Sequence, residues 1–205
     1  KAGMPYAAGW STNLPTVNLA NAFTAGDIRK AATVLNIDDY INSNPALFTG
    51  VASNNPAFAN NPAYQVAPYK NTGWYNQKYL PRKSETSGQV ELNYLNNFRT
   101  IRYAEVLLMA AEAFNRSTTP NDTKAQLYLN RVRRRAFAVN DASKDITATG
   151  TALRQAIWDE RRLELAMEGD RFFDLVRTGQ AAAKITGFAV GKHELFPIPQ
   201  YEIEV

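Results

Sequence analysis

The stretch "DERRLELAMEGDRFFDLVR" (159–177) contains ten charged side chains in nineteen positions, six acidic and four basic, and every basic one is an arginine. Large apolar residues fill most of the other positions: Leu163, Leu165, Met167, Phe172, Phe173, Leu175 and Val176. Such a stretch could be a set of catalytic carboxylates, a solvated helix face or a cluster of buried ion pairs. The direction in which the charges point decides between these interpretations.

The composition of the chain narrows the classes of protein to which it can belong. At 205 residues, 45% hydrophobic and 20% charged, it resembles a globular domain with one core. Its densest basic cluster, "RVRRRA" (131–136), has no recognition motif beside it, so no nucleic-acid partner is expected. Cysteine is absent and His193 is the single histidine, which excludes disulfides, cysteine–zinc sites and paired-histidine metal motifs. We therefore expect no metal and no cofactor.

The first part of the chain is predicted to be rich in loops. Residues 1–81 hold seven of the ten prolines. Short helices are expected at 16–23 and 26–36, the second with Asp27 near its start. The segment 42–81 has proline and asparagine too often for regular structure. Irregular segments of this length in folded chains are often functional.

The rest of the chain is helical by its hydrophobic period. Helices are expected at 98–115, 123–137, 151–169 and 170–179. The first two are joined by a short turn and are amphipathic, which predicts an antiparallel hairpin like a tetratricopeptide unit. The apolar stripe of the first consists of Ile101, Ala104, Leu108 and Ala111. Gly169 is expected to end the third helix.

A helical wheel of the third helix separates the charges of the opening stretch. Glu160 and Glu164 fall inside the apolar arc, whereas Asp159 and Arg162 face away from it. A lone buried carboxylate would cost several kcal/mol in lost hydration, so the two inward glutamates are expected to be paired. Arginine suits this role because its planar fork bonds a carboxylate at two points.

These considerations predict a structural ion-pair network and no enzyme. A glycosidase would need a carboxylic acid that stays protonated near neutral pH, and neighbouring arginines lower a carboxyl pKa. The members of the network that the helical wheels predict are Glu105, Glu112, Arg133, Arg135, Glu160, Arg161 and Glu164.

Four linked motifs resemble the SusD/RagB family: "IRYAEVLLMAAEAFNR", "YLNRVRRRAF", "AIWDERRLELAMEGDRFFDLVRTGQ" and "LFPIPQYEI". The resemblance is strong over 98–203, and it extends upstream through Asp27 and Arg29 and through "YNQKY" (75–79). Further positions match the family's shared pattern: Arg102, Asn130, Gly169, Pro197 and Pro199. The resemblance also implies that Arg171, Asp174 and Arg177 belong to the structural ion-pair network. The resemblance implies a mainly α, SusD-like fold with long irregular loops. We expect a loop-rich variable part (1–95) and a helical core (96–205) within one continuous domain.

The resemblance also implies a function. Members of this family are lipoproteins of the bacterial outer membrane that capture a nutrient, usually an oligosaccharide, at the cell surface. They deliver it to a SusC-like TonB-dependent transporter. The family begins with a signal peptide, a lipidated cysteine and helical repeats, which this chain lacks. We therefore expect it to be the C-terminal portion of a longer protein, as a fragment or as a processed form. Contact with a membrane is expected only through that lipid anchor.

Sugar-binding proteins place flat aromatic rings against pyranose rings and polar groups against hydroxyls. The candidate ligand-binding residues are Trp10, Tyr69, Asn71, Trp74, Tyr75, Asn76 and Arg82. The competing interpretation of each aromatic residue is core packing. The competing function is a tetratricopeptide-like scaffold that binds a protein or a peptide.

Overall fold

The computed structural model describes residues 13–48, 72–85, 95 and 97–203. The chain forms two compact units, residues 1–167 and 168–205, and each is described by itself. Helices make up most of the regular structure in the described ranges, which also contain one two-stranded sheet. The prediction of a mainly α fold is confirmed.

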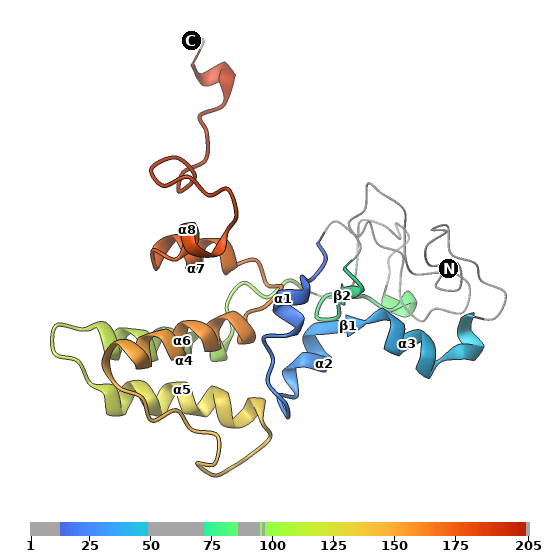
Figure 1. Ribbon diagram of the computed structural model, residues 1–205, viewed down its shortest axis with the longest axis horizontal. Coiled ribbons are helices and arrows are strands. Elements are labelled where there is room, and N and C mark those ends of the chain that lie inside the picture. The colour runs from blue at the N-terminus through green and yellow to red at the C-terminus, as the bar shows by residue number, and fades with distance from the viewer. Residues whose placement is uncertain (1–12, 49–71, 86–94, 96, 204–205) are drawn as a thin grey trace. The chain divides into compact units, whose positions relative to one another are not determined.

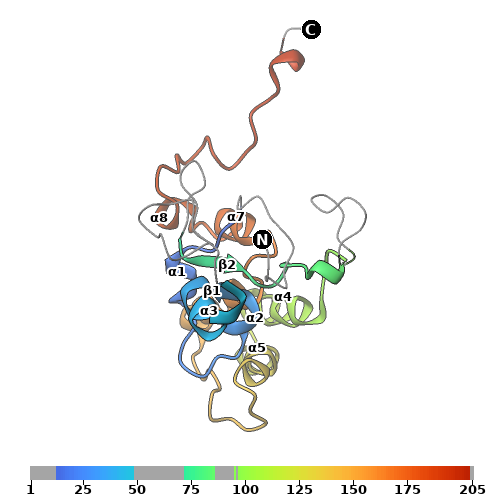
Figure 2. The same ribbon diagram turned by 90° about the vertical axis from the view of Figure 1, so that its right-hand side faces the viewer.

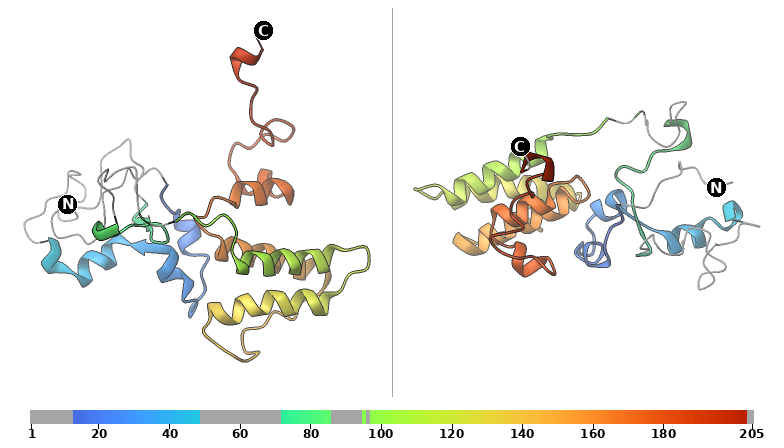
Figure 3. Two further views of the ribbon diagram at one scale, coloured as in Figure 1. Left: turned by 180° about the vertical axis from the view of Figure 1, so that it is seen from behind. Right: turned by 90° about the horizontal axis from the view of Figure 1, so that it is seen from above.

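Three helices form the core of the first unit: α4 (Tyr103–Arg116), α5 (Asp122–Ala136) and α6 (Gly150–Glu164). Figure 1 shows them side by side, and Figure 3 shows α4 and α5 as an antiparallel hairpin. Their inward faces supply the buried cluster of Ala104, Leu107, Leu108, Ala111, Ala125, Leu129, Val132, Leu153 and Ile157. The predicted hairpin is therefore confirmed. Its first helix starts later than expected, because Arg102 is extended, and the expectation that Ile101 faces the core is wrong, since it is 67% exposed.

Polar side chains hold the ends of these helices together. The side chain of Asn121 caps α5 by accepting a hydrogen bond from the backbone N–H of Lys124 at 3.0 Å, as its position before the helix predicts. Asn115 is buried near the end of α4 and donates to Asp122 Oδ1 and to the carbonyl of Gly150, both at 2.9 Å. The buried amide of Asn115 thus links the C-terminal end of α4 to the N-terminal ends of α5 and α6.

Helix α6 ends at Glu164, five residues before the expected stop at Gly169. The carbonyl oxygen of Glu164 instead accepts hydrogen bonds from Lys78 Nζ at 3.1 Å and from Arg102 Nη2 at 2.5 Å. Side chains therefore satisfy a carbonyl that would otherwise be left open at the helix end. Ala166, which a longer helix would turn outward, is buried as a result.

The N-terminal part packs short elements around a small sheet. They are α1 (Val17–Ala20), α2 (Arg29–Thr33), β1 (Val34–Asn36), α3 (Ile37–Ser43), β2 (Trp74–Asn76) and 3₁₀ helices at Pro45–Phe48 and Lys83–Glu85. Strands β1 and β2 pair antiparallel, with Val34 opposite Asn76 and Leu35 opposite Tyr75 (Figure 2). The expected helix at 26–36 is therefore wrong over its last three residues, because this segment gains a strand partner that lies far away in the sequence.

The second unit contains α7 (Arg171–Arg177), α8 (Ala181–Lys184) and a 3₁₀ helix at Gln200–Glu202. Leu175 and Ala181 are its buried apolar residues among those described. Gly179 follows α7 with a φ of +70°, a left-handed conformation that glycine adopts without steric cost. In neither unit do the described residues form a helix with the length and hydropathy needed to span a bilayer.

Candidate functional site

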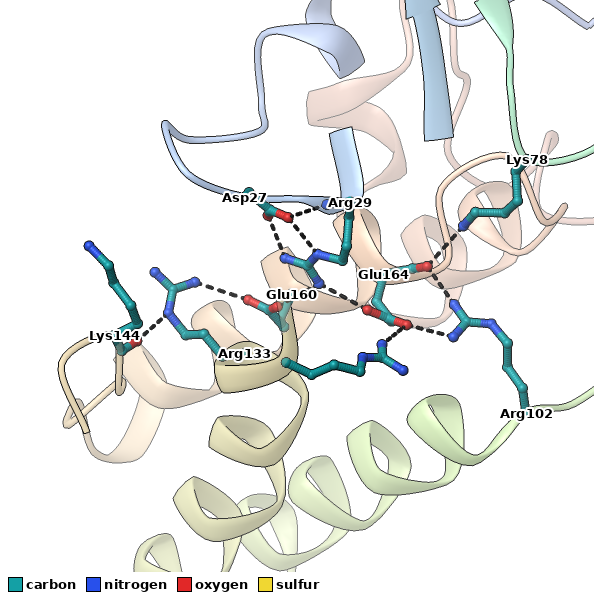
Figure 4. Close-up of polar contacts among 9 residues, drawn as sticks. Asp27, Arg29, Lys78, Arg102, Arg133, Lys144, Glu160 and Glu164 are labelled. Carbon is teal, nitrogen blue, oxygen red and sulfur yellow. Dashed lines mark hydrogen bonds and ion pairs between the residues drawn. The ribbon is translucent and has the colours of Figure 1, made fainter. Parts of the chain in front are cut away.

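Glu164, the last residue of α6, is the centre of a buried cluster of opposite charges. Its side chain is 3% exposed. Its Oε1 accepts from Arg102 Nη1 at 2.5 Å and from Arg135 Nη2, and its Oε2 accepts from Arg29 Nη1 at 3.0 Å. Figure 4 shows the arginines converging on this carboxylate from three segments of the chain. With the two bonds to its carbonyl, Glu164 binds the helix core to the N-terminal part.

The surroundings of Glu164 decide its protonation state. Burial alone would raise its pKa, but the hydrogen bonds from Arg135 and Arg102 outweigh this effect and lower the pKa to about 2. Glu164 is therefore ionised at neutral pH. A general acid for glycoside hydrolysis requires the opposite shift, so Glu164 cannot supply that proton.

Arg29 connects this carboxylate to two others. Its Nε and Nη2 donate to the two oxygens of Asp27 at 2.9 and 2.7 Å, a bidentate pair, while Nη1 bonds Glu164. Nη1 also forms an ion pair with Glu160 Oε1 at 2.7 Å, but the two groups are not aligned as a hydrogen bond. Burial would lower the pKa of Arg29, but Asp27 and Glu160 raise it. The guanidinium therefore remains charged.

Glu160 extends the cluster one turn back along α6. Its Oε2 accepts a hydrogen bond from Arg133 Nη1 at 3.1 Å. Arg133 Nε in turn donates to the carbonyl of Lys144 at 2.6 Å in the loop that precedes α6 (Figure 4). The cluster thereby fixes the loop between α5 and α6 as well.

Other residues of the predicted network form further ion pairs among the described residues. Arg161 faces Glu105 at 3.6 Å, Glu112 pairs with Arg116 along α4 at 2.8 Å, and Asp174 pairs with Arg177 within α7 at 2.7 Å. Arg171 begins α7 in the second unit. The members that the prediction left out are Asp27, Arg29, Lys78 and Arg102. All four lie at positions or in segments that the family resemblance had already marked, Lys78 within "YNQKY", and this was the available signal.

Strand β2 carries three of the candidate ligand-binding residues. Trp74 is half-buried, and the ammonium of Lys30 lies 5.3 Å from the centroid of its ring. Tyr75 is also half-buried, opposite Leu35 in the sheet. Asn76 uses its side-chain oxygen to accept from the backbone N–H of Tyr79 at 3.3 Å, which shapes the turn after the strand. The candidates Trp10, Tyr69 and Asn71 lie outside the described residues.

A polar hollow follows β2. It has a volume of about 220 Å³ and is lined by residues 77–80, Arg82, Glu85, Asn97 and Arg99. Of the candidate ligand-binding residues, Arg82 lies in this lining. Tyr79 stacks on Phe98 with ring centroids 5.8 Å apart, so the two sides of the hollow touch. Nothing in the local sequence marked Asn97 or Arg99, because the segments meet only in the folded chain.

Among the described ranges, no three His, Cys, Asp or Glu residues are grouped so that they could hold an ion. His193 accepts a hydrogen bond on Nδ1 from the backbone N–H of Ala189 at 3.0 Å, which is a local turn contact.

Two SusD-like proteins are similar to this chain, one over nearly all of it and one over less than half. SusD-like protein P2 of Formosa agariphila is 27% identical over 201 residues, which is 96% of this chain and 36% of that protein. SusD-like protein P25 of the same organism is 41% identical over 87 residues, 42% of this chain and 16% of that protein. The chain thus spans little more than a third of the first of these relatives.

Two solved structures of surface glycan-binding proteins are also similar to this chain. Surface glycan-binding protein A from Bacteroides thetaiotaomicron matches 98% of this chain with a TM-score of 0.74 and 28% identity, and the chain covers 41% of that structure. A structure of surface glycan-binding protein A from the same organism in complex with laminarihexaose matches with a TM-score of 0.73, 29% identity and the same coverage. The model of the SusD family matches residues 6–195, and the chain therefore belongs to the SusD family.

Proposed function

We propose that this chain is part of a surface protein that binds a nutrient oligosaccharide and delivers it to a SusC-like TonB-dependent transporter. The observation that carries the proposal is the likeness to surface glycan-binding protein A, one structure of which is a complex with laminarihexaose. We infer that the protein lies on the bacterial outer membrane, where a lipid anchor holds it.

The binding surface that we propose runs from β2 into the polar hollow. Trp74 and Tyr75 offer half-buried rings that are held in register by the pairing with β1. Rings fixed in this way stack on sugars with little loss of side-chain entropy. Trp10, Tyr69 and Asn71 belong to the same proposal on the basis of their sequence alone.

We also propose that the protein performs no chemical reaction on its ligand. Glu164, the buried carboxylate at the centre of the ion-pair cluster, is held ionised by three arginines. An ionised, fully bonded carboxylate stabilises the fold and has no proton to donate. Capture and release require only reversible binding.

The test is calorimetric titration of the full-length protein with laminarihexaose and with a panel of neutral and acidic hexasaccharides. We expect one class to bind, and Trp74→Ala to weaken that binding about tenfold, because a truncated aromatic anchor typically costs ~1–2 kcal/mol or more. The matched control is Tyr103→Ala, which removes an exposed ring from α4. If the folded protein bound no saccharide of the panel, the proposal would be wrong.

The transporter is tested separately. Solubilised outer membranes that contain the tagged full-length protein should yield a TonB-dependent transporter of the SusC class on affinity purification. Recovery of the protein without such a partner, under conditions that preserve known complexes of this class, would contradict the delivery step and leave glycan binding untouched.

The scaffold alternative draws on one observation. Helix α4 exposes Tyr103, Val106 and Met109 at 63%, 43% and 44%. Binding of an amphipathic peptide that Val106→Asp abolishes, together with indifference to every saccharide, would favour this alternative.

A further inference from the structure

We propose that the polar hollow after β2 binds an acidic group, a carboxylate or a sulfate ester, on a sugar residue, so that the preferred glycan is anionic. The inference rests on the proposed function and adds the class of ligand. It begins from the charges of the lining. Three lining residues are basic, Lys78, Arg82 and Arg99, and one is acidic, Glu85. The hollow is therefore positive at neutral pH.

The three cations are not equally available to a ligand. Lys78 Nζ donates to the carbonyl of Glu164 at 3.1 Å, so Lys78 serves the scaffold. The guanidinium groups of Arg82 and Arg99 have neither a hydrogen bond nor an ion pair within the part of the chain that the structure describes. Both side chains are exposed.

The single acidic residue does not neutralise these arginines. Glu85 Oε2 accepts from the backbone N–H of Arg82 at 2.8 Å, and the backbone N–H of Glu85 donates to the carbonyl of Arg82 at 2.9 Å. The carboxylate therefore closes the turn at residues 82–85 rather than pairing with a guanidinium. Elsewhere in the same unit, Arg29, Arg102, Arg133 and Arg135 each contact a carboxylate.

Hydrogen bonds and a ring stack fix the walls of the hollow. The side chain of Asn76 holds the turn at Tyr79, and the backbone N–H of Leu80 donates to the carbonyl of Gln77 at 3.4 Å. The stack of Tyr79 on Phe98 joins this turn to the segment that carries Arg99. Arginines from two segments are thus brought to one site before any ligand arrives, which reduces the entropy that binding would cost.

Size and chemistry together select the ligand. A volume of about 220 Å³ is below the ~300–1,000 Å³ that encloses a drug-sized ligand. The hollow therefore fits one residue of a chain rather than a whole oligosaccharide. Guanidinium groups bond carboxylates and sulfates at two points. The amide of Asn97, which is exposed and also in the lining, suits a hydroxyl of the same sugar residue.

The experiment compares four ligands by calorimetry with the full-length protein: an oligogalacturonate hexamer, a sulfated hexasaccharide, laminarihexaose and inorganic sulfate. We expect one acidic hexasaccharide to bind at least about tenfold more tightly than laminarihexaose. The double variant Arg82→Gln/Arg99→Gln should abolish this preference, by weakening the binding of the acidic hexasaccharide at least about tenfold. Arg131→Gln is the matched control, because Arg131 is an exposed arginine on α5 that lies over the ring of Tyr103.

Each other outcome has a distinct meaning. Tight binding of laminarihexaose with no preference for an acidic chain overturns the inference and leaves the proposed function standing. An acidic preference that survives in the double variant overturns it too, because the hollow would then not be its source. Inorganic sulfate that binds as tightly as the sulfated chain shows a simple anion site and no sugar specificity. Failure of every saccharide to bind overturns the inference together with the proposed function.

Discussion

The end of α6 and the hollow after β2 use arginine in opposite ways. Around Glu164, the guanidiniums of Arg29, Arg102 and Arg135 are bonded to a buried carboxylate. At the hollow, Arg82 and Arg99 are exposed and, within the described ranges, unpaired. Composition therefore does not reveal which arginines support the fold and which remain for a ligand, because this depends on the partner that each guanidinium finds in the folded chain.

The largest effect is expected from Glu164→Ala. The substitution leaves three arginines without their common partner, and breaking one side of a buried ion pair typically costs ~3–5 kcal/mol in the free energy of unfolding. Denaturant titration followed by circular dichroism measures the loss. A loss below ~1 kcal/mol would mean that this carboxylate behaves like an exposed charge. Asp159→Ala, on the outward face of the same helix, is the control.

Acidification should weaken the same cluster. The pKa of Glu164 is lowered from 4.5 to about 2 in the folded protein, so its contribution to stability is complete above the unfolded pKa and is lost as the pH falls through the folded one. A shift of this size corresponds to roughly 3 kcal/mol. Unfolding free energies measured between pH 6 and pH 2.5 should fall less steeply for Glu164→Gln than for the unaltered protein. Equal slopes would contradict the assignment.

The hollow should respond differently to the loss of its arginines. Arg82→Gln/Arg99→Gln is expected to change the free energy of unfolding by no more than ~0.5 kcal/mol, since surface substitutions without partners rarely do more. The same variant should lose its preference for acidic saccharides. A destabilisation above ~1 kcal/mol would show that these arginines belong to the scaffold after all, and would erase the contrast between the two regions.

The smallest effect is expected from Tyr79→Phe. The hydroxyl of Tyr79 is buried and has no hydrogen-bond partner among the residues that the structure describes. Removing an unsatisfied polar group should leave the melting temperature unchanged or raise it slightly, because a desolvation cost of ~1 kcal/mol disappears while the stack on Phe98 remains. A fall in melting temperature by several degrees would reveal a bond to this hydroxyl. Tyr79→Leu, which removes the ring, should lower it.

Much of the helical core could be predicted from periodicity. The turn residues between 115 and 122 and the apolar faces of α4 and α5 are local features, and they appear where the sequence placed them. The wheel also turned Glu160 and Glu164 inward, and both are buried. The wheel failed for Ala166 because it assumed a helix that continues past Glu164. Side chains from elsewhere in the chain end that helix, and no local pattern contains them.

By itself the sequence determined the helix hairpin, the inward direction of two glutamates and the membership of the SusD family, because these depend on neighbours within a few turns or on linked motifs. Only the tertiary structure decided that Arg29 bonds Glu164 across 135 residues, that residues 34–36 form a strand, and that Arg82 and Arg99 share a hollow. The physical reason is that an ion pair, a strand partner and a cavity wall each need two distant segments. Their energy depends on burial and distance, which arise only when the chain has folded.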